Sequence, residues 1–148
     1  MKSVFAAVVA ALAVATTVVS GAEVEFKSCG GVLTVEKIDG TTWPPAKGQH
    51  FSSTTYLSNP TGADAKFDGA WTIQTKWNGM NADSQSGNVC DGFGDVKCNA
   101  VVAPGGKLQI VNDGDFPSSA PAGTYVVRTE LKDSQYNTLY CYTTTFKA

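Results

Sequence analysis

Histidine is almost absent from this sequence. The single histidine among 148 residues is His50, and its alternating neighbours Ser52 and Thr54 are typical of a solvated strand face. A Ser-His-Asp hydrolase would hold a nucleophile beside that imidazole, yet no Gly-x-Ser-x-Gly pattern is present. A small hydrolase that uses His50 is therefore an alternative without a catalytic set, and we expect no enzyme.

Metal-binding and phosphate-binding patterns are also missing. Cys90 and Cys98 are separated by seven residues, whereas zinc-binding pairs usually lie two to four residues apart and redox pairs follow Cys-x-x-Cys. Asp113-Gly114-Asp115 could bind calcium but lacks EF-hand spacing and equally suits a polar turn. The glycines between Cys90 and Asp95 do not precede a helix, as a phosphate loop requires. We expect no metal and no cofactor.

An excess of basic residues is lacking too. The chain has 11 Lys and Arg against 13 Asp and Glu, and its net charge is −2. A mildly acidic chain lacks the positive footprint of nucleic-acid binders, and anionic membranes do not attract it electrostatically. Asn-x-Ser/Thr acceptor sites for glycosylation are absent as well, since Asn59 is followed by proline.

Only one long apolar run occurs, and it lies at the start. Lys2 precedes the uncharged stretch Val4–Val19, and the small residues Ser20-Gly21-Ala22 follow it. This order is typical of a secretory signal peptide. The alternative is a membrane anchor, but the run is shorter than the ~20 residues that span a bilayer. We expect residues 1–22 to be a signal peptide and residues 23–148 to be one secreted or lumenal domain.

Four cysteines remain in that domain: Cys29, Cys90, Cys98 and Cys141. An even set in an oxidising compartment predicts two disulfides, for which three pairings are open. A short Cys90–Cys98 bridge would stabilise by about 2–3 kcal/mol in the chain-entropy model.

No helical periodicity persists in residues 23–148. Short runs of alternating apolar and polar residues are instead separated by proline and glycine turns, which is typical of antiparallel sandwiches and barrels. In the clearest run, Phe67–Trp77, one face collects Trp71, Ile73, Thr75 and Trp77. Other runs cover residues 30–38, 49–57, 107–111, 125–131 and 139–146, and the last two predict a closing hairpin. The interval Asn78–Asn99 shows no strand pattern, so we expect a long loop there.

The aromatic residues on these strands have two interpretations. They fill the core, which is the commonest role of such stripes, or they line an apolar pocket between separated sheets. Periodicity alone leaves both open.

The order of landmarks resembles the ML lipid-recognition family, which includes the Niemann–Pick type C lysosomal sterol carrier, group 2 mite allergens and fungal phosphatidylglycerol/phosphatidylinositol transfer proteins. FKSCGG around Cys29 comes first, followed by PPAKG at Pro44–Gly48 and the central pair Cys90 and Cys98. Pro121-x-Gly123-x-Tyr125 then precedes an alternating strand, and Cys141 lies in the returning strand LYCYTTTF. The similarity spans nearly all of 23–148.

This resemblance implies an all-β, immunoglobulin-like antiparallel sandwich of about seven strands with an apolar cavity between its sheets. It also implies Cys29–Cys141 and Cys90–Cys98 disulfides. The implied function is binding and transfer of a sterol or phospholipid. The carrier would be a monomer, either secreted or in the lumen of a lysosome or vacuole, that contacts a membrane or acceptor protein transiently. The expected cavity wall or supporting core comprises Phe51, Trp71, Ile73, Trp77, Leu108, Tyr125, Val127, Leu131, Tyr142 and Phe146.

The alternative function is a secreted recognition module with a solid core. Such a module would bind a protein or a glycan through loops such as Trp43–Gly48. The presence or absence of a bound lipid distinguishes the two.

Overall fold

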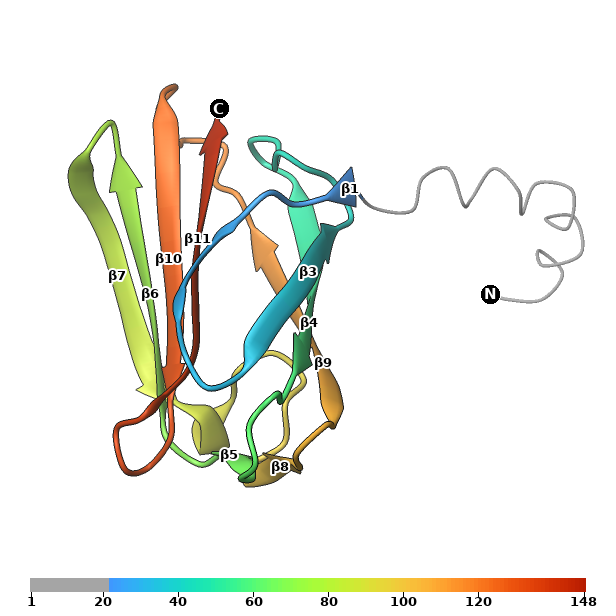
Figure 1. Cartoon of the computed structure of the whole chain (residues 1–148). Coiled ribbons are helices and arrows are strands. Elements are labelled where there is room, and N and C mark those ends of the chain that lie inside the picture. Colours follow the sequence, from blue (N-terminus) through green and yellow to red (C-terminus); the bar gives the residue numbers. More distant parts are fainter. Residues whose placement is uncertain (1–21) are drawn as a thin grey trace, which may run out of the picture.

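The computed structural model describes residues 22–148, so the expected signal peptide lies outside the described residues except for Ala22. Eleven strands and one 3₁₀ turn make up the described chain (Figure 1). They are β1 (Ala22–Glu23), β2 (Lys27–Gly30), β3 (Thr34–Gly40), β4 (His50–Ser58), β5 (Ala65–Phe67), β6 (Ala70–Trp77), β7 (Met80–Asn88), η1 (Val89–Asp91), β8 (Ala100–Val102), β9 (Lys107–Asp115), β10 (Thr124–Lys132) and β11 (Thr138–Lys147). The part of the chain that the structure describes contains no helix long and apolar enough to cross a membrane.

Two antiparallel sheets pack face to face. The first has the strand order β1-β3-β4-β9, and the second has the order β2-β11-β10-β6-β7. The short pair β5-β8 lies at the lower end of the sandwich (Figure 1). The predicted all-β sandwich is thus confirmed, as is the closing hairpin, in which Tyr125 pairs with Phe146 and Leu131 pairs with Tyr140.

The expectation of a long loop over Asn78–Asn99 was wrong for its first half. Met80–Asn88 form β7, which pairs with β6 from Trp77↔Met80 to Ala70↔Asn88. Eight of the nine residues of β7 are exposed, because it is the outermost strand of its sheet. Sequence alternation reveals a strand only where one face is buried, and β7 buries neither.

The predicted run 30–38 is divided between the two sheets. Gly30 ends β2 in one sheet, and Thr34 begins β3 in the other. Gly30 and Gly31 have φ values of +113° and +121°, which glycine adopts at low cost. A Cβ on Gly31 would lie 2.5 Å from the Leu139 carbonyl oxygen, so the chain can change sheets here only because that side chain is missing.

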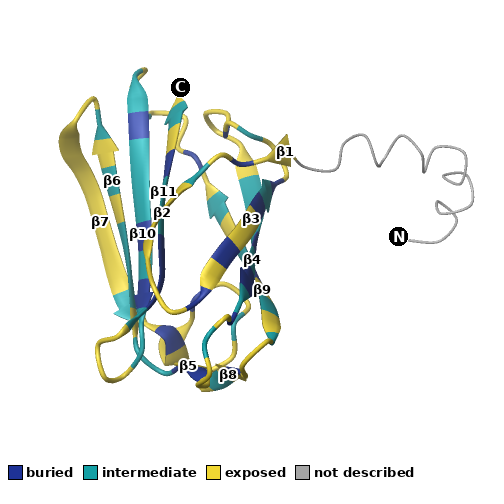
Figure 2. Ribbon diagram, in the orientation of Figure 1, coloured by how far each residue is buried: buried dark blue, intermediate teal, exposed yellow. Residues whose placement is uncertain are grey.

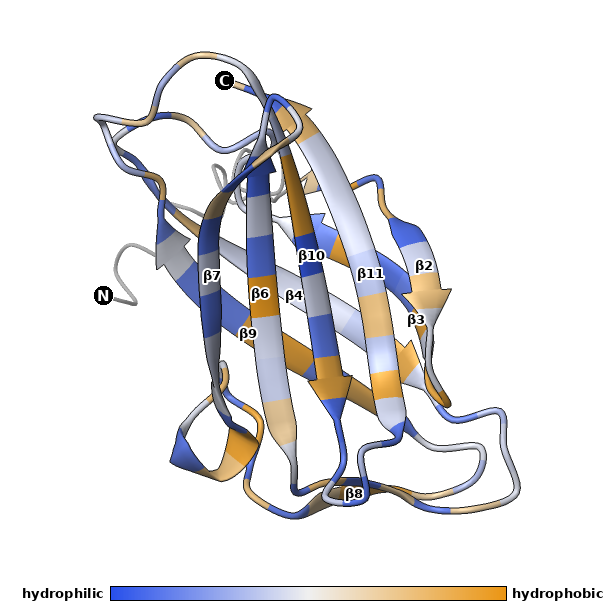
Figure 3. Cartoon of the chain, turned by 90° about the vertical axis from the view of Figure 1, so that its left-hand side faces the viewer, coloured by the Kyte–Doolittle hydropathy of each residue, from blue (hydrophilic) through white to orange (hydrophobic). Residues whose placement is uncertain are grey.

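Large apolar side chains fill the lower half of the sandwich. Leu57, Ile110, Leu131 and Leu139 are each at most 1 % exposed. Both β10 and β11 are buried toward that end, and β10 has one further buried band near its upper end (Figure 2). Hydrophobic and hydrophilic residues follow one another in bands along β6 and β10, as the colouring in Figure 3 shows. This half is a solid core, and it supports the more open half above it.

Both disulfides that the family resemblance implied are present. Cys29–Cys141 joins β2 to β11 across 112 residues of sequence. Cys90–Cys98 closes a short loop that begins at η1. Among the described residues, no cysteine is free.

Candidate functional site

A cavity of about 620 Å³ lies between the two sheets. Every one of the seven long strands contributes to its wall, together with the segments that follow β3, η1 and β9. The apolar and aromatic residues of that wall are Val24, Ile38, Trp43, Pro45, Phe51, Ile73, Ala82, Phe93, Phe116, Pro117, Ala120, Pro121, Tyr125, Val127, Tyr142 and Phe146.

The cavity exists because one layer of inward side chains is small. In the second sheet this layer runs across neighbouring strands as Thr144, Val127 and Thr75. In the first sheet the corresponding layer is Gly40 and Ser53, with Asn112 beside them. These side chains are too small to meet across the sandwich, so they leave an open volume where the layers below are filled.

Four aromatic rings close one end of the cavity. Phe146 stacks on Tyr125 with ring centroids 5.3 Å apart, and Trp43 meets Phe146 edge-on at 5.2 Å. Phe116 packs edge-on against both Tyr125 and Phe146, at 5.4 and 5.6 Å. Such tilted and stacked pairs add about 0.5–1.5 kcal/mol each beyond area burial. We call Trp43, Phe116, Tyr125 and Phe146 the aromatic cap.

Two side-chain hydrogen bonds hold the segment Pro117–Gly123 over the aromatic cap. The Tyr125 hydroxyl donates to the Pro121 carbonyl at 2.6 Å, and the Trp77 indole N–H donates to the Ala122 carbonyl at 3.1 Å. The segment therefore depends on two aromatic side chains that the sequence pattern had placed on inward strand faces.

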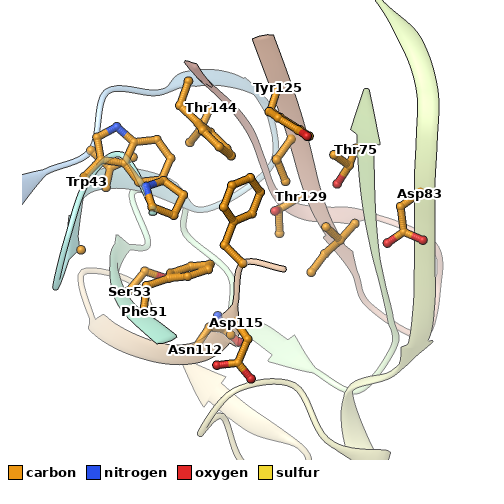
Figure 4. Close-up of a pocket in the computed structure, with 18 of the residues that line it drawn as sticks. Trp43, Phe51, Ser53, Thr75, Asp83, Asn112, Asp115, Tyr125, Thr129 and Thr144 are labelled. Carbon is orange, nitrogen blue, oxygen red and sulfur yellow. The ribbon is translucent and has the colours of Figure 1, made fainter. Parts of the chain in front are cut away.

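The opposite side of the cavity reaches the edge strands β7 and β9. Both are the last strands of their sheets and are not paired with each other. The β7 residues Asp83 and Gln85 line the cavity here, and the Gln85 amide donates to Asp83 Oδ2 at 2.9 Å. Asn112 of β9 lies across from them (Figure 4), whereas the Asp115 carboxylate turns to the outer face and contacts His50. This side of the cavity, between the edge strands β7 and β9, is therefore polar, whereas the aromatic cap is apolar. We call it the mouth.

The disulfide loop spans the same edge. The Asp95 backbone N–H donates to the Val111 carbonyl at 3.0 Å, and the Val111 N–H donates to Asp95 Oδ1 at 2.7 Å. From this loop Phe93 turns inward, 6 % exposed, and meets Trp71 at a centroid distance of 5.5 Å. The loop thus connects the end of β7 to β9.

The structure divides the ten predicted wall residues into two groups. Those that line the cavity are Phe51, Ile73, Tyr125, Val127, Tyr142 and Phe146. The other four lie outside its wall: Leu131 is fully buried, Leu108 and Trp71 pack against the core, and Trp77 holds the 117–123 segment. A role of any of the ten in binding stays a prediction.

Several wall residues were not predicted from the sequence. Trp43 and Phe116 lie in loops, where no periodicity indicates which side chain turns inward. Ser53, Thr75, Thr129 and Thr144 have the same parity as the predicted apolar residues of their strands. Their parity could have identified them as inward-facing. Ser and Thr, however, occur on both the buried and the exposed face of a sheet.

His50 lies outside the cavity wall, on the exposed face of β4. Its Nδ1 atom lies 2.9 Å from Asp115 Oδ1, and its Nε2 atom lies 3.8 Å from Asp113 Oδ1. These are exposed cross-strand contacts between β4 and β9. Within residues 22–148, no three His, Cys, Asp or Glu side chains gather as a metal-ligand set.

Comparison with known proteins places this geometry in a family. Residues 23–148 match the family model of the ML domain. A Niemann-Pick type C2 protein from the Japanese carpenter ant has a similar structure, with a TM-score of 0.62, 12% identity, and coverage of 83% of this chain and 98% of that chain. The C-terminal domain of wzt gives a TM-score of 0.50 at 12% identity, covering 84% of this chain and 74% of that one.

At such low identities the two structures show the shared fold alone. No protein matches in a search of curated sequences. The family model, in contrast, covers the entire described domain from Glu23 onward. The chain therefore belongs to the ML domain family.

Proposed function

We propose that this protein binds a lipid between its two sheets, carries it as a sterol or phospholipid, and catalyses no reaction. The observation that carries the proposal is the cavity of about 620 Å³ above a solid core. Ligand pockets in proteins measure about 300–1,000 Å³ and are mostly apolar. Membership of a lipid-recognition family supports the same proposal.

Physical chemistry favours such a ligand. Each buried methylene contributes about 0.8 kcal/mol, so a partly enclosed acyl chain or sterol gains several kcal/mol. The sheet ladders already satisfy the backbone groups of the wall, so an apolar ligand leaves none of them without a partner.

We further propose that the protein is a secreted or lumenal monomer that meets a membrane or an acceptor protein transiently. The two disulfides support an oxidising compartment. An internal cavity also requires only one chain to enclose the lipid.

Native mass spectrometry of the secreted protein, followed by solvent extraction and lipid analysis, tests the proposal. We expect a lipid adduct of one molecule per chain. A bare mass that stays unchanged after incubation with sterol and phospholipid vesicles would contradict it and favour a recognition module.

A further inference from the structure

The cavity is lined by hydroxyl groups as well as rings. Ser53 lies on one side, and Thr75, Thr129 and Thr144 lie on the other (Figure 4). Thr129 and Tyr142 are direct neighbours across β10 and β11, one layer below Val127 and Thr144. We call this lower layer the cavity floor.

One more hydroxyl lies behind the floor, outside the cavity wall. Thr55 of β4 follows Ser53 with the same parity and is fully buried. Its Oγ1 atom has no hydrogen-bond partner among the described residues. A buried hydroxyl without a partner costs about 1–3 kcal/mol. The Tyr142 hydroxyl lies close to Thr55, so a small shift of the floor that let a ligand oxygen reach Thr55 would remove that cost.

The Tyr142 phenol lies in the same region. Burial raises the pKa of Tyr142, and the nearby hydroxyls of Thr129 and Thr55 offset part of that rise. Three hydroxyl groups from both sheets therefore lie close together in a poorly hydrated place. Each can both donate and accept a hydrogen bond.

The charges around the cavity restrict the ligand further. No basic side chain lines the cavity among the residues that the structure describes, and Asp83 is the carboxylate on its inward face. Asp113 and Asp115 border the cavity, but their carboxylates turn to the outer face of β9, toward His50. A carboxylate or phosphate inside would lose its hydration without gaining a counter-charge. The oxygen that reaches the floor is therefore uncharged.

We infer that the ligand is a neutral amphiphile that buries a hydroxyl or carbonyl oxygen at the cavity floor, against Thr129 and Tyr142 and with Thr55 directly behind them. This inference rests on the proposed lipid-binding function and narrows it. It favours sterols and long-chain alcohols or esters over fatty acids and anionic phospholipids.

Displacement of the neutral fluorescent probe N-phenyl-1-naphthylamine by three compounds of equal chain length tests the inference. The compounds are dodecanol, dodecane and dodecanoate. They are titrated into the wild type, T55V, T129V and Y142F, and into T145V as a matched control, since Thr145 is exposed on the outer face of β11. Circular dichroism verifies that each variant folds.

We expect T55V, T129V and Y142F each to weaken dodecanol binding by about 2–10-fold, the range for one neutral hydrogen bond. Dodecane binding should stay equal or tighten, T145V should change neither, and dodecanoate should bind most weakly to the wild type. Equal shifts for dodecanol and dodecane, or no shift for dodecanol in any floor variant, would overturn the inference alone. If the wild type bound neither the probe nor any of the three compounds, the proposed function would fail with it.

Discussion

At the residue scale, the interior combines two kinds of side chain with opposite energetic roles. Leu57, Leu131 and Leu139 are fully or almost fully buried and favour the folded state through the hydrophobic effect. Thr55 is equally buried, but its hydroxyl lacks a partner among the described residues and opposes folding. Such a residue costs stability in the folded protein.

Replacing Thr55 by valine should therefore stabilise the empty protein. The change removes the unsatisfied hydroxyl and keeps the branched shape, so we expect a gain of about 1 kcal/mol in the free energy of unfolding. Urea denaturation of delipidated protein measures it. The exposed-site variant T145V should stay within about 0.5 kcal/mol of the wild type, and a loss of stability in T55V would contradict the interpretation.

Glu130 should make the free energy of unfolding depend on pH in the acidic range. Burial would raise the pKa of its carboxyl, but hydrogen bonds from Thr138 (2.9 Å) and Arg128 (3.1 Å) outweigh burial, and the pKa lies below the ordinary 4.5. A carboxyl whose pKa is lower in the folded state stabilises above its unfolded pKa, and this contribution is lost as pH falls through the folded pKa.

Glu130→Gln should therefore lower the unfolding free energy at pH 7 by up to about 1 kcal/mol. The difference from the wild type should shrink as the pH falls below 4.5. Urea titrations at several pH values measure it, and a difference that stayed constant down to pH 2–3 would be inconsistent with this account.

At the element scale, the connections determine how the sheets are joined. The Gly30-Gly31 crossing passes the chain from β2 to β3, and the disulfide loop connects the end of β7 to β9. The Gly30-Gly31 crossing lies at the β2 edge of the second sheet, and the disulfide loop lies at the opposite edge, beside β7 and β9. The two edges are therefore held by different means.

Gly31→Ala should destabilise more than Gly30→Ala. Both positions have a left-handed φ, which costs a non-glycine residue about 1–3 kcal/mol. Only at Gly31 would the new Cβ also meet backbone, at 2.5 Å from the Leu139 oxygen, whereas nothing lies within 4 Å at Gly30. Thermal unfolding of the two variants measures the difference, and equal melting temperatures would contradict the steric part of the argument.

Removing the Cys90–Cys98 bridge should act mainly at the mouth. The double change to alanine should cost about 2–3 kcal/mol, against about 5 kcal/mol for the long Cys29–Cys141 loop, by the chain-entropy model. Hydrogen exchange should show lost protection at Asp95 and Val111, whose backbone N–H groups donate across that edge. Unchanged protection there would mean that the loop holds its place without the disulfide.

At the scale of the whole molecule, the sandwich is a solid core below and a cavity above. The fold remains stable because the lower layers, both disulfides and the ladders do not depend on the upper layer. The upper layer is thus free to be small, and its size determines how much space a ligand has.

A large side chain in that upper layer should weaken lipid binding and leave the stability of the fold nearly unchanged. Ser53→Trp places a large ring in the cavity, and we expect at least about a tenfold loss of lipid affinity with little loss of stability. Ser52→Trp adds the same ring on the outer face of β4 and should bind normally. Native mass spectrometry with extracted lipid compares the two. Full lipid loading of S53W would show that the ligand lies elsewhere.

Period-two alternation in the sequence predicts the all-β class, the closing hairpin and the inward face of most long strands, because that pattern follows directly from strand geometry. The family resemblance added the disulfide pairing. That β7 is a strand could be seen only in the folded chain, since an edge strand with two polar faces carries no alternation. The position of the cavity likewise follows only from the folded chain. Thr144, Val127 and Thr75 share one layer through sheet register, and Gly40 and Ser53 face them from strands far away in the sequence. Parity indicates which face a side chain takes, but the layer it occupies depends on how separate strands align.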